Sequence, residues 1–147
     1  MTTHQIQLVK ESWALVEPSG KAAGALFYRH LFEMAPQVRH LFGENLEAQQ
    51  GKLIRMLQYI VSNIDQLHQI AKEVQDLGRR HYHYHALPHH YELIGSALFK
   101  TLQVATKDAW TPEVENAWRT AFNTLRNMMI IAQESERTLY DENATGT

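Results

Sequence analysis

The chain has 147 residues, 44% of them hydrophobic, and a formal net charge of −2 with histidine neutral. This length and hydrophobic content suit one compact domain with a single core and exclude a disordered protein. The charge gives no electrostatic basis for nucleic-acid binding, and the lack of cysteine excludes disulfides, iron–sulfur clusters and thiolate metal ligands.

The first half of the chain shows apolar residues at helical spacing of three and four. Thr2 and Gln5 have the spacing of a capping box, and Gly20 separates the first predicted helix from the second. Pro36 opens a short helical turn that ends near Phe42. The apolar positions of the next predicted helix are interrupted by one polar residue, and they are Leu46, Gln49, Leu53, Leu57, Ile60, Ile64 and Leu67.

The second half continues this pattern. One helical stripe ends in a histidine and consists of Ile70, Val74, Leu77 and His81. A helix follows Pro88, and Thr111-Pro112-Glu113 combines an N-cap, a proline and an acidic residue at the start of a last helix. We therefore predict an all-α domain over residues 1–133 and a polar, frayed tail over residues 134–147.

The chain has no apolar run of about 20 residues that could span a bilayer. Its first residues, Met1 to Gln5, lack the basic and apolar regions of a signal peptide. We therefore expect a soluble cytoplasmic protein without membrane partners.

Three polar side chains lie on apolar helix faces, where each needs a hydrogen-bond partner. A neutral imidazole at the end of a helix, such as that of His81, can coordinate iron. Tyr28 and Gln49 offer a phenol and an amide that can donate hydrogen bonds to a bound gas. Alternatively, His81 and Tyr28 bond main-chain carbonyls and Gln49 marks the exposed start of its helix.

Several motifs carry a family resemblance. The segments 26–32 and 35–42 resemble the second and third helices of bacterial single-domain haemoglobins. Leu77 to His81 and His90 to Gly95 resemble the proximal region of those proteins and of neuroglobins, and residues 117–122 are similar to the last helix. The resemblance covers about residues 4–132 and implies a globin fold packed around a non-covalently bound haem b.

The resemblance also implies roles for individual residues. His81 corresponds to the proximal iron ligand, and Tyr28, Gln49 and Leu53 correspond to the distal gas pocket. The implied haem contacts are Phe42, Lys52, Leu77, Leu87, Tyr91 and Ile94.

The sequence departs from the family pattern in two places. A glutamate that raises electron donation by the proximal histidine in flavohaemoglobin-like relatives aligns with Gln133, which favours reversible gas binding. Five of the nine histidines lie between His81 and His90, and His81 and His85 are spaced for one helix face. This histidine cluster has two interpretations, which are a zinc or nickel site and a hydrated loop.

The leading prediction is therefore reversible binding of dioxygen, with NO and CO as further ligands, for storage, transport or scavenging. The alternative is a nitric oxide dioxygenase, and this chain would need a separate reductase because it contains no Gly-x-Gly-x-x-Gly fingerprint. A gas sensor, an electron carrier and a haem-free, zinc-binding helical protein are further alternatives.

Overall fold

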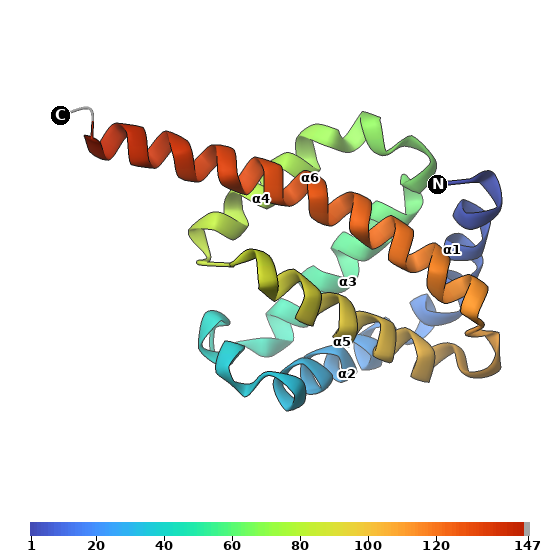
Figure 1. Cartoon of the computed structure of the whole chain (residues 1–147). Helices are drawn as coiled ribbons and strands as arrows, with labels where there is room; N and C mark the ends of the chain where they lie inside the picture. Colours follow the sequence, from blue (N-terminus) through green and yellow to red (C-terminus); the bar gives the residue numbers. More distant parts are fainter. Residues whose placement is uncertain (146–147) are drawn as a thin grey trace.

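The structure, a computed structural model, describes residues 1–145, and all its elements are helical. Six α-helices are joined by short 3-10 segments (Figure 1). In chain order the elements are α1 (Thr3–Val16), η1 (Glu17–Ser19), α2 (Gly20–Met34), η2 (Pro36–Leu41), α3 (Leu46–Ser62), η3 (Ile64–Ile70), α4 (Ala71–His83), α5 (Pro88–Thr106), η4 (Lys107–Ala109) and α6 (Pro112–Thr145). The predicted all-α class is confirmed.

The predicted helix starts have the expected capping bonds. Thr2 Oγ1 accepts a hydrogen bond from the Gln5 amide at 3.0 Å, and the Thr2 amide donates to Gln5 Oε1 at 2.9 Å. At the start of α6, Thr111 Oγ1 accepts from the Val114 amide at 3.2 Å. These side chains satisfy amides that have no partner within the first turn of a helix.

The long apolar stripe from Leu46 to Leu67 is divided between two elements. The helix α3 ends at Ser62, and Asn63 donates its side-chain amide to the carbonyl of Tyr59 at 2.8 Å. Within η3, Gln66 has the non-helical angles φ −137° and ψ 42°. A continuous apolar stripe therefore does not require a continuous helix here.

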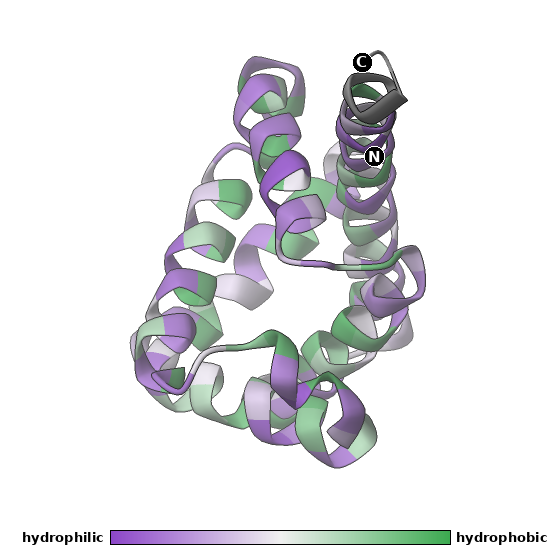
Figure 2. Ribbon diagram, turned by 90° about the vertical axis from the view of Figure 1, so that its left-hand side faces the viewer, coloured by the Kyte–Doolittle hydropathy of each residue, from purple (hydrophilic) through white to green (hydrophobic). Residues whose placement is uncertain are grey.

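The helices pack in pairs around one main core. The pair α2 and α5 and the pair α4 and α6 are in extended contact, and α3 packs on α2. Two tryptophans fix the α1 side of this core: Trp118 Nε1 donates to Ser12 Oγ at 2.8 Å, and Trp13 Nε1 donates to Gln58 Oε1 at 2.6 Å. Hydrophobic and hydrophilic residues alternate around the helices, as expected where one face is buried (Figure 2).

The helix α3 has no extended packing contact with α4 or α5 within the described chain. Several large apolar side chains of α3 and α5 are consequently only half-buried, among them Leu53, Leu57 and Ile94.

The last helix extends past residue 133, where the sequence predicts the start of a polar tail. The helix α6 continues to Thr145 and projects beyond the other helices (Figure 1). Arg137 pairs with Glu134 at 2.9 Å and with Asp141 at 3.1 Å, and such i,i+3 and i,i+4 pairs stabilise a helix. A boundary between a domain and a tail at residue 133 stays a prediction.

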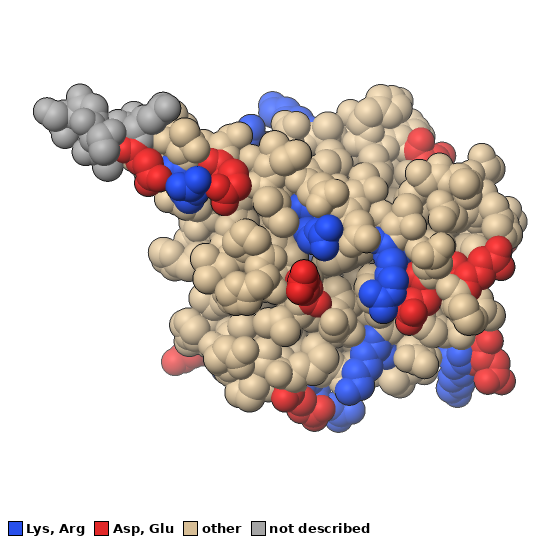
Figure 3. All heavy atoms as spheres, viewed as in Figure 1, with Lys and Arg blue, Asp and Glu red and all other residues tan. Residues whose placement is uncertain are grey.

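Charged side chains of both signs are interspersed on the face shown in Figure 3, including the projecting end of α6. No helix among residues 1–145 has the length and hydropathy needed to cross a membrane.

A close helix crossing positions α4 against α6. A Cβ atom added at Gly78 would lie 2.6 Å from the carbonyl oxygen and 2.9 Å from the Cα of Met129, which are main-chain atoms. Only glycine therefore allows this approach between the two helices.

We expect Gly78→Ala to lower the free energy of unfolding by about 1–3 kcal/mol, because the added methyl group must push the two helices apart. Urea denaturation measures this change. Gly43→Ala is the matched control, since a Cβ there meets no atom within 4 Å. Equal stability of the two variants would contradict the close crossing.

A buried histidine lies at the contact between α2 and α5. His30 Nδ1 lies 3.2 Å from Thr101 Oγ1, whose hydroxyl donates to the Ala97 carbonyl, so the imidazole N–H is the donor to Thr101. Burial lowers the pKa of His30, and the nearby Lys100 lowers it further. The unfolded chain therefore binds this proton at a higher pH than the folded chain does.

We expect the free energy of unfolding to fall as the pH drops below about 6.5, the unfolded pKa of histidine. His30→Gln should reduce this pH dependence more than His68→Gln, a change at an exposed residue. Urea denaturation between pH 5 and 8 measures the slopes, and identical slopes for wild type and His30→Gln would show that His30 does not contribute.

Candidate functional site

The helix α4 presents His81 two residues before its end at His83. The Nδ1–H of His81 donates to the carbonyl of Leu77 at 2.7 Å, so the lone pair of Nε2 remains available. Burial lowers the pKa of His81, which keeps the imidazole neutral. A neutral imidazole with one nitrogen bonded to a carbonyl is the form in which histidine binds a metal.

The predicted hydrogen bond of His81 to a main-chain carbonyl is therefore present, and it is compatible with metal binding because it uses only one ring nitrogen. Within the described chain, no side-chain polar atom is both fully enclosed and without a hydrogen-bond partner. Since Nε2 of His81 forms no hydrogen bond with residues 1–145, this atom is not fully enclosed.

The helix α2 contributes Tyr28, which is only 6% exposed. Its ring packs edge-on against Phe42, with the ring centroids 5.4 Å apart, and Phe27 and Phe32 complete the aromatic cluster. Burial raises the pKa of Tyr28 to about 12, so the phenol is neutral and acts as a donor near pH 7. Its hydroxyl forms no hydrogen bond with residues 1–145 and, like Nε2 of His81, is not fully enclosed.

The structure separates Gln49 from its neighbour Gln50. The helix α3 crosses α2 at Gly24, where the Cβ of Gln50 would lie 3.2 Å from an added Cβ. Gln50 therefore packs on α2, together with Ile54 one turn later. Gln49 is half-buried and shares its face of α3 with Leu53. This placement supports the choice of Gln49, whose role stays a prediction.

The segment after α2 is held by a residue that the sequence analysis did not single out. Arg39 Nη1 donates to the carbonyls of Phe42 and Gly43, at 3.1 and 3.3 Å, and its guanidinium lies over the ring of Phe32 at 5.3 Å. These bonds fix the main chain at Phe42. The signal available in the sequence was only a basic residue in the last turn of η2.

The other predicted haem contacts differ in exposure. Tyr91 is buried, and its ring stacks on His81 with the centroids 6.1 Å apart and an angle of 24° between the planes. Leu53, Leu77 and Ile94 are half-buried, as residues lining a cofactor pocket would be. Lys52 is exposed and Leu87 is 50% exposed, so these two lie at the surface.

Among the described residues, including the histidines after His81, no three His, Asp or Glu side chains are grouped so that they could hold a metal ion. His83 lies 3.5 Å from Glu136 of α6, and His90 Nδ1 accepts from the Leu87 amide at 2.9 Å. These two histidines thus have structural contacts in the helices that flank the loop.

The described residues fit a haem. The imidazole of His81 on α4 and the phenol of Tyr28 on α2 each keep one polar atom without a hydrogen-bond partner among residues 1–145. Among the predicted haem contacts, Leu53, Leu77 and Ile94 are apolar and half-buried. A planar apolar cofactor would cover their exposed surface and bring a metal to the imidazole.

Comparison with known proteins assigns the family. The globin family model matches residues 25–129. The chain belongs to the globin family. The haem cofactor and the globin fold expected from the sequence are thereby confirmed at the level of the family.

Individual relatives agree with this assignment. A flavohemoprotein from Pseudomonas putida is 32% identical over 97% of this chain, which spans 36% of the length of that protein. An anaerobic nitrite reductase from Gossypium hirsutum is 27% identical over 84% of this chain and 85% of its own length. A solved bacterial globin from Campylobacter jejuni has a TM-score of 0.79 and 22% identity, covering 95% of this chain and 99% of its own. The last comparison shows the fold alone.

Proposed function

We propose that this globin reversibly binds a small diatomic gas at a haem iron held by His81, with dioxygen as the principal ligand and NO and CO as others. The observation that carries this proposal is the Nδ1–H bond of His81 to Leu77, which leaves Nε2 available. The haem would supply an iron that His81 holds and that can bind the gas.

The distal residues would hold the gas by hydrogen bonding. Tyr28 has a neutral hydroxyl without a partner in the described chain, and Gln49 has a half-buried amide on the face of Leu53. Donors in an apolar surrounding stabilise partial negative charge on a ligand more strongly than donors in water do. Phe42 and Leu53 would exclude water from the same space.

The proximal contacts support reversible binding. The Nδ1 partner of His81 is a neutral carbonyl, and Tyr91 donates its hydroxyl proton to the neutral amide of Gln133 at 2.9 Å. A neutral acceptor raises the electron donation of an imidazole less than a carboxylate does. This arrangement favours storage, transport or scavenging over activation of the oxygen–oxygen bond.

Nitric oxide dioxygenation is the second candidate, because the chain aligns over nearly all of its length with flavohemoproteins. Conversion of NO and O₂ to nitrate consumes one electron per turnover, so this activity would need a reductase that supplies the electron. Catalytic consumption of NO with such a reductase, at a rate matching nitrate formation, would place this activity first.

We expect His81→Ala to weaken haem binding by more than about tenfold, the ratio equivalent to about 1.4 kcal/mol. Titration of the apoprotein with hemin, followed by the Soret absorbance, measures the affinity. His89→Ala is the matched control, since His89 is exposed in the same histidine-rich segment. Unchanged affinity and an unchanged spectrum in His81→Ala would reject the ligand assignment.

We expect Tyr28→Phe and Gln49→Leu each to accelerate oxygen dissociation by roughly twofold to tenfold, since one hydrogen bond contributes about 0.5–1.5 kcal/mol. Stopped-flow mixing with CO measures the rate. Gln50→Leu is the control for Gln49, because Gln50 packs on α2. If Gln50→Leu changes the rate and Gln49→Leu does not, the distal assignment belongs to Gln50.

A further inference from the structure

One arginine side chain bonds the irregular segment between η2 and α3. Phe42 follows η2 with the extended angles φ −109° and ψ 144°, so the main chain leaves the helix there. Arg39 Nη1 donates to the carbonyl of Phe42 at 3.1 Å and to that of Gly43 at 3.3 Å. A Cβ atom added at Gly43 would meet no atom within 4 Å. The segment therefore depends on these hydrogen bonds more than on packing at Gly43.

The ring of Phe42 belongs to a group of three aromatic rings in mutual contact. Its centroid lies 5.4 Å from that of Tyr28 and 5.5 Å from that of Phe32, and both contacts are edge-on. The centroids of Tyr28 and Phe32 are 5.8 Å apart. We name these three residues the aromatic triangle. Edge-on contacts are directional, so a shift of one ring changes the contacts of the other two.

Arg39 contacts two members of the aromatic triangle. Its hydrogen bond fixes the main chain of Phe42, and its guanidinium carbon lies 5.3 Å from the centroid of the Phe32 ring. A planar guanidinium can lie on an aromatic face while its N–H groups bond carbonyls. Arg39 is half-buried, which strengthens both interactions relative to water. One side chain thus sets the position of Phe42 relative to Phe32.

The third member of the triangle, Tyr28, is oriented by ring packing. Its hydroxyl forms no hydrogen bond with residues 1–145, so no polar contact within this part of the chain fixes its direction. The ring is 6% exposed, and it contacts Phe27 of its own helix in addition to Phe32 and Phe42. The place of the phenol oxygen therefore follows from these ring contacts, and a shift of Phe42 would move it.

We propose that Arg39 is a positioning residue that sets the place of the Tyr28 hydroxyl through Phe42 and Phe32. This inference rests on the proposed role of Tyr28 as a hydrogen-bond donor to the gas. Arg39 bonds the main chain of one phenylalanine and lies on the ring of the other, and both of these rings contact the phenol.

Two substitutions of Arg39 separate geometry from charge. Arg39→Met removes both the hydrogen bonds and the charge. Arg39→Lys keeps the charge but has no planar group that can lie on Phe32 while it bonds both carbonyls. The bonds of Arg39 reach only three and four residues along the chain, so their loss is local and the helices can still pack. The matched control is Arg29→Met, which removes an exposed guanidinium next to Tyr28 in the chain.

The first measurement is the C–O stretching band in the infrared spectrum of the ferrous CO form. A donor close to the bound CO lowers the frequency of this band, because it stabilises negative charge on the ligand oxygen. We expect a shift to higher frequency, or a second band at higher frequency, in both Arg39 variants. Arg29→Met should keep the wild-type band, and a role of Arg39 limited to stability would leave the band unchanged.

The second measurement is the rate of oxygen dissociation, combined in a double-mutant cycle with Tyr28→Phe. We expect Arg39→Met to accelerate dissociation by about twofold to fivefold, which is less than the loss of a complete hydrogen bond can cause. In the Tyr28→Phe background the same substitution should have no further effect, because the hydroxyl that it displaces is absent.

Wild-type bands in both Arg39 variants would overturn the positioning role, and so would equal accelerations by Arg39→Met in the two backgrounds. A wild-type band in Arg39→Lys with a shifted band in Arg39→Met would assign the effect to charge and would also overturn it. In these cases the proposed function stands if Tyr28→Phe itself shifts the band.

Two other results concern the proposed function instead. An unchanged band in Tyr28→Phe would remove Tyr28 from the gas site, and a wild-type protein that forms no CO complex would overturn the proposed function. Either result would overturn this inference as well.

Discussion

The hydrogen bond from the Nδ1–H of His81 to the carbonyl of Leu77 is the interaction on which the proposed site depends. It selects one imidazole tautomer, fixes the plane of the ring and leaves the second nitrogen available. The bond is local, since both residues lie one turn apart on α4. The direction in which Nε2 points also depends on the position of α4, because the imidazole is fixed to this helix.

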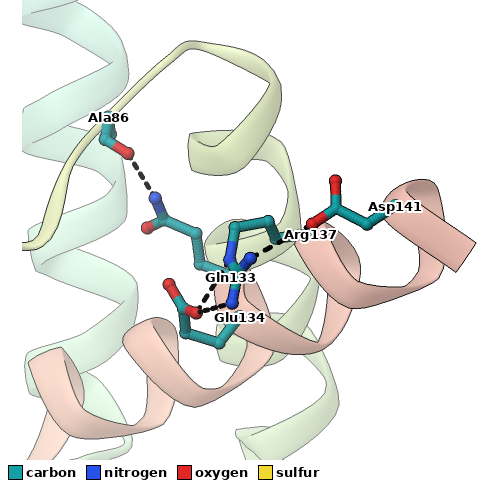
Figure 4. Close-up of polar contacts among 5 residues, drawn as sticks. All are labelled: Ala86, Gln133, Glu134, Arg137 and Asp141. Atoms are coloured by element: carbon teal, nitrogen blue, oxygen red, sulfur yellow. Dashed lines mark hydrogen bonds and ion pairs between the residues drawn. The ribbon is translucent and has the colours of Figure 1, made fainter.

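The helix α4 is held mainly by α6. Gly78 allows the two main chains to approach closely, and the end of α4 contacts the part of α6 beyond residue 133 through His83 and Glu136. Arg137 stabilises this part of the helix by pairing with acidic residues one turn before and after it. The polar end of α6 thus helps to position α4. The ion pairs of Arg137 stabilise the helical structure of this end (Figure 4).

The two sides of the proposed gas site differ in their physical character. On the distal side, burial in an aromatic cluster keeps the phenol of Tyr28 neutral and raises its pKa to about 12. On the proximal side, neutral acceptors surround the imidazole and the hydroxyl of Tyr91. In the proposed site, hydrogen bonds would hold the gas, and the imidazole of His81 would donate little electron density to the iron. This combination suits a protein that binds and releases its ligand.

Most of the helices and their caps could be predicted from the sequence, because helical periodicity and capping depend on residues three or four positions apart. The capping box at Thr2, the N-cap at Thr111 and the position of His81 at the end of an apolar stripe are local features of this kind. The family resemblance, also carried by local motifs, correctly indicated the globin fold.

Tertiary structure decided the features that depend on how helices cross. The apolar stripe favoured Gln49 in the sequence, whereas the packing of its neighbour Gln50 against Gly24 of α2 depends on how the two helices cross. The sequence placed Gln133 in alignment with a glutamate but could not reveal its bond to Ala86, which lies 47 residues away in the chain. Beyond residue 133, the contact of Glu136 with His83 of α4 likewise depends on how the two helices pack. Local spacing in the sequence therefore indicated which residues are candidates for the site. The packing of helices that are far apart in the chain determined what each of these residues contacts.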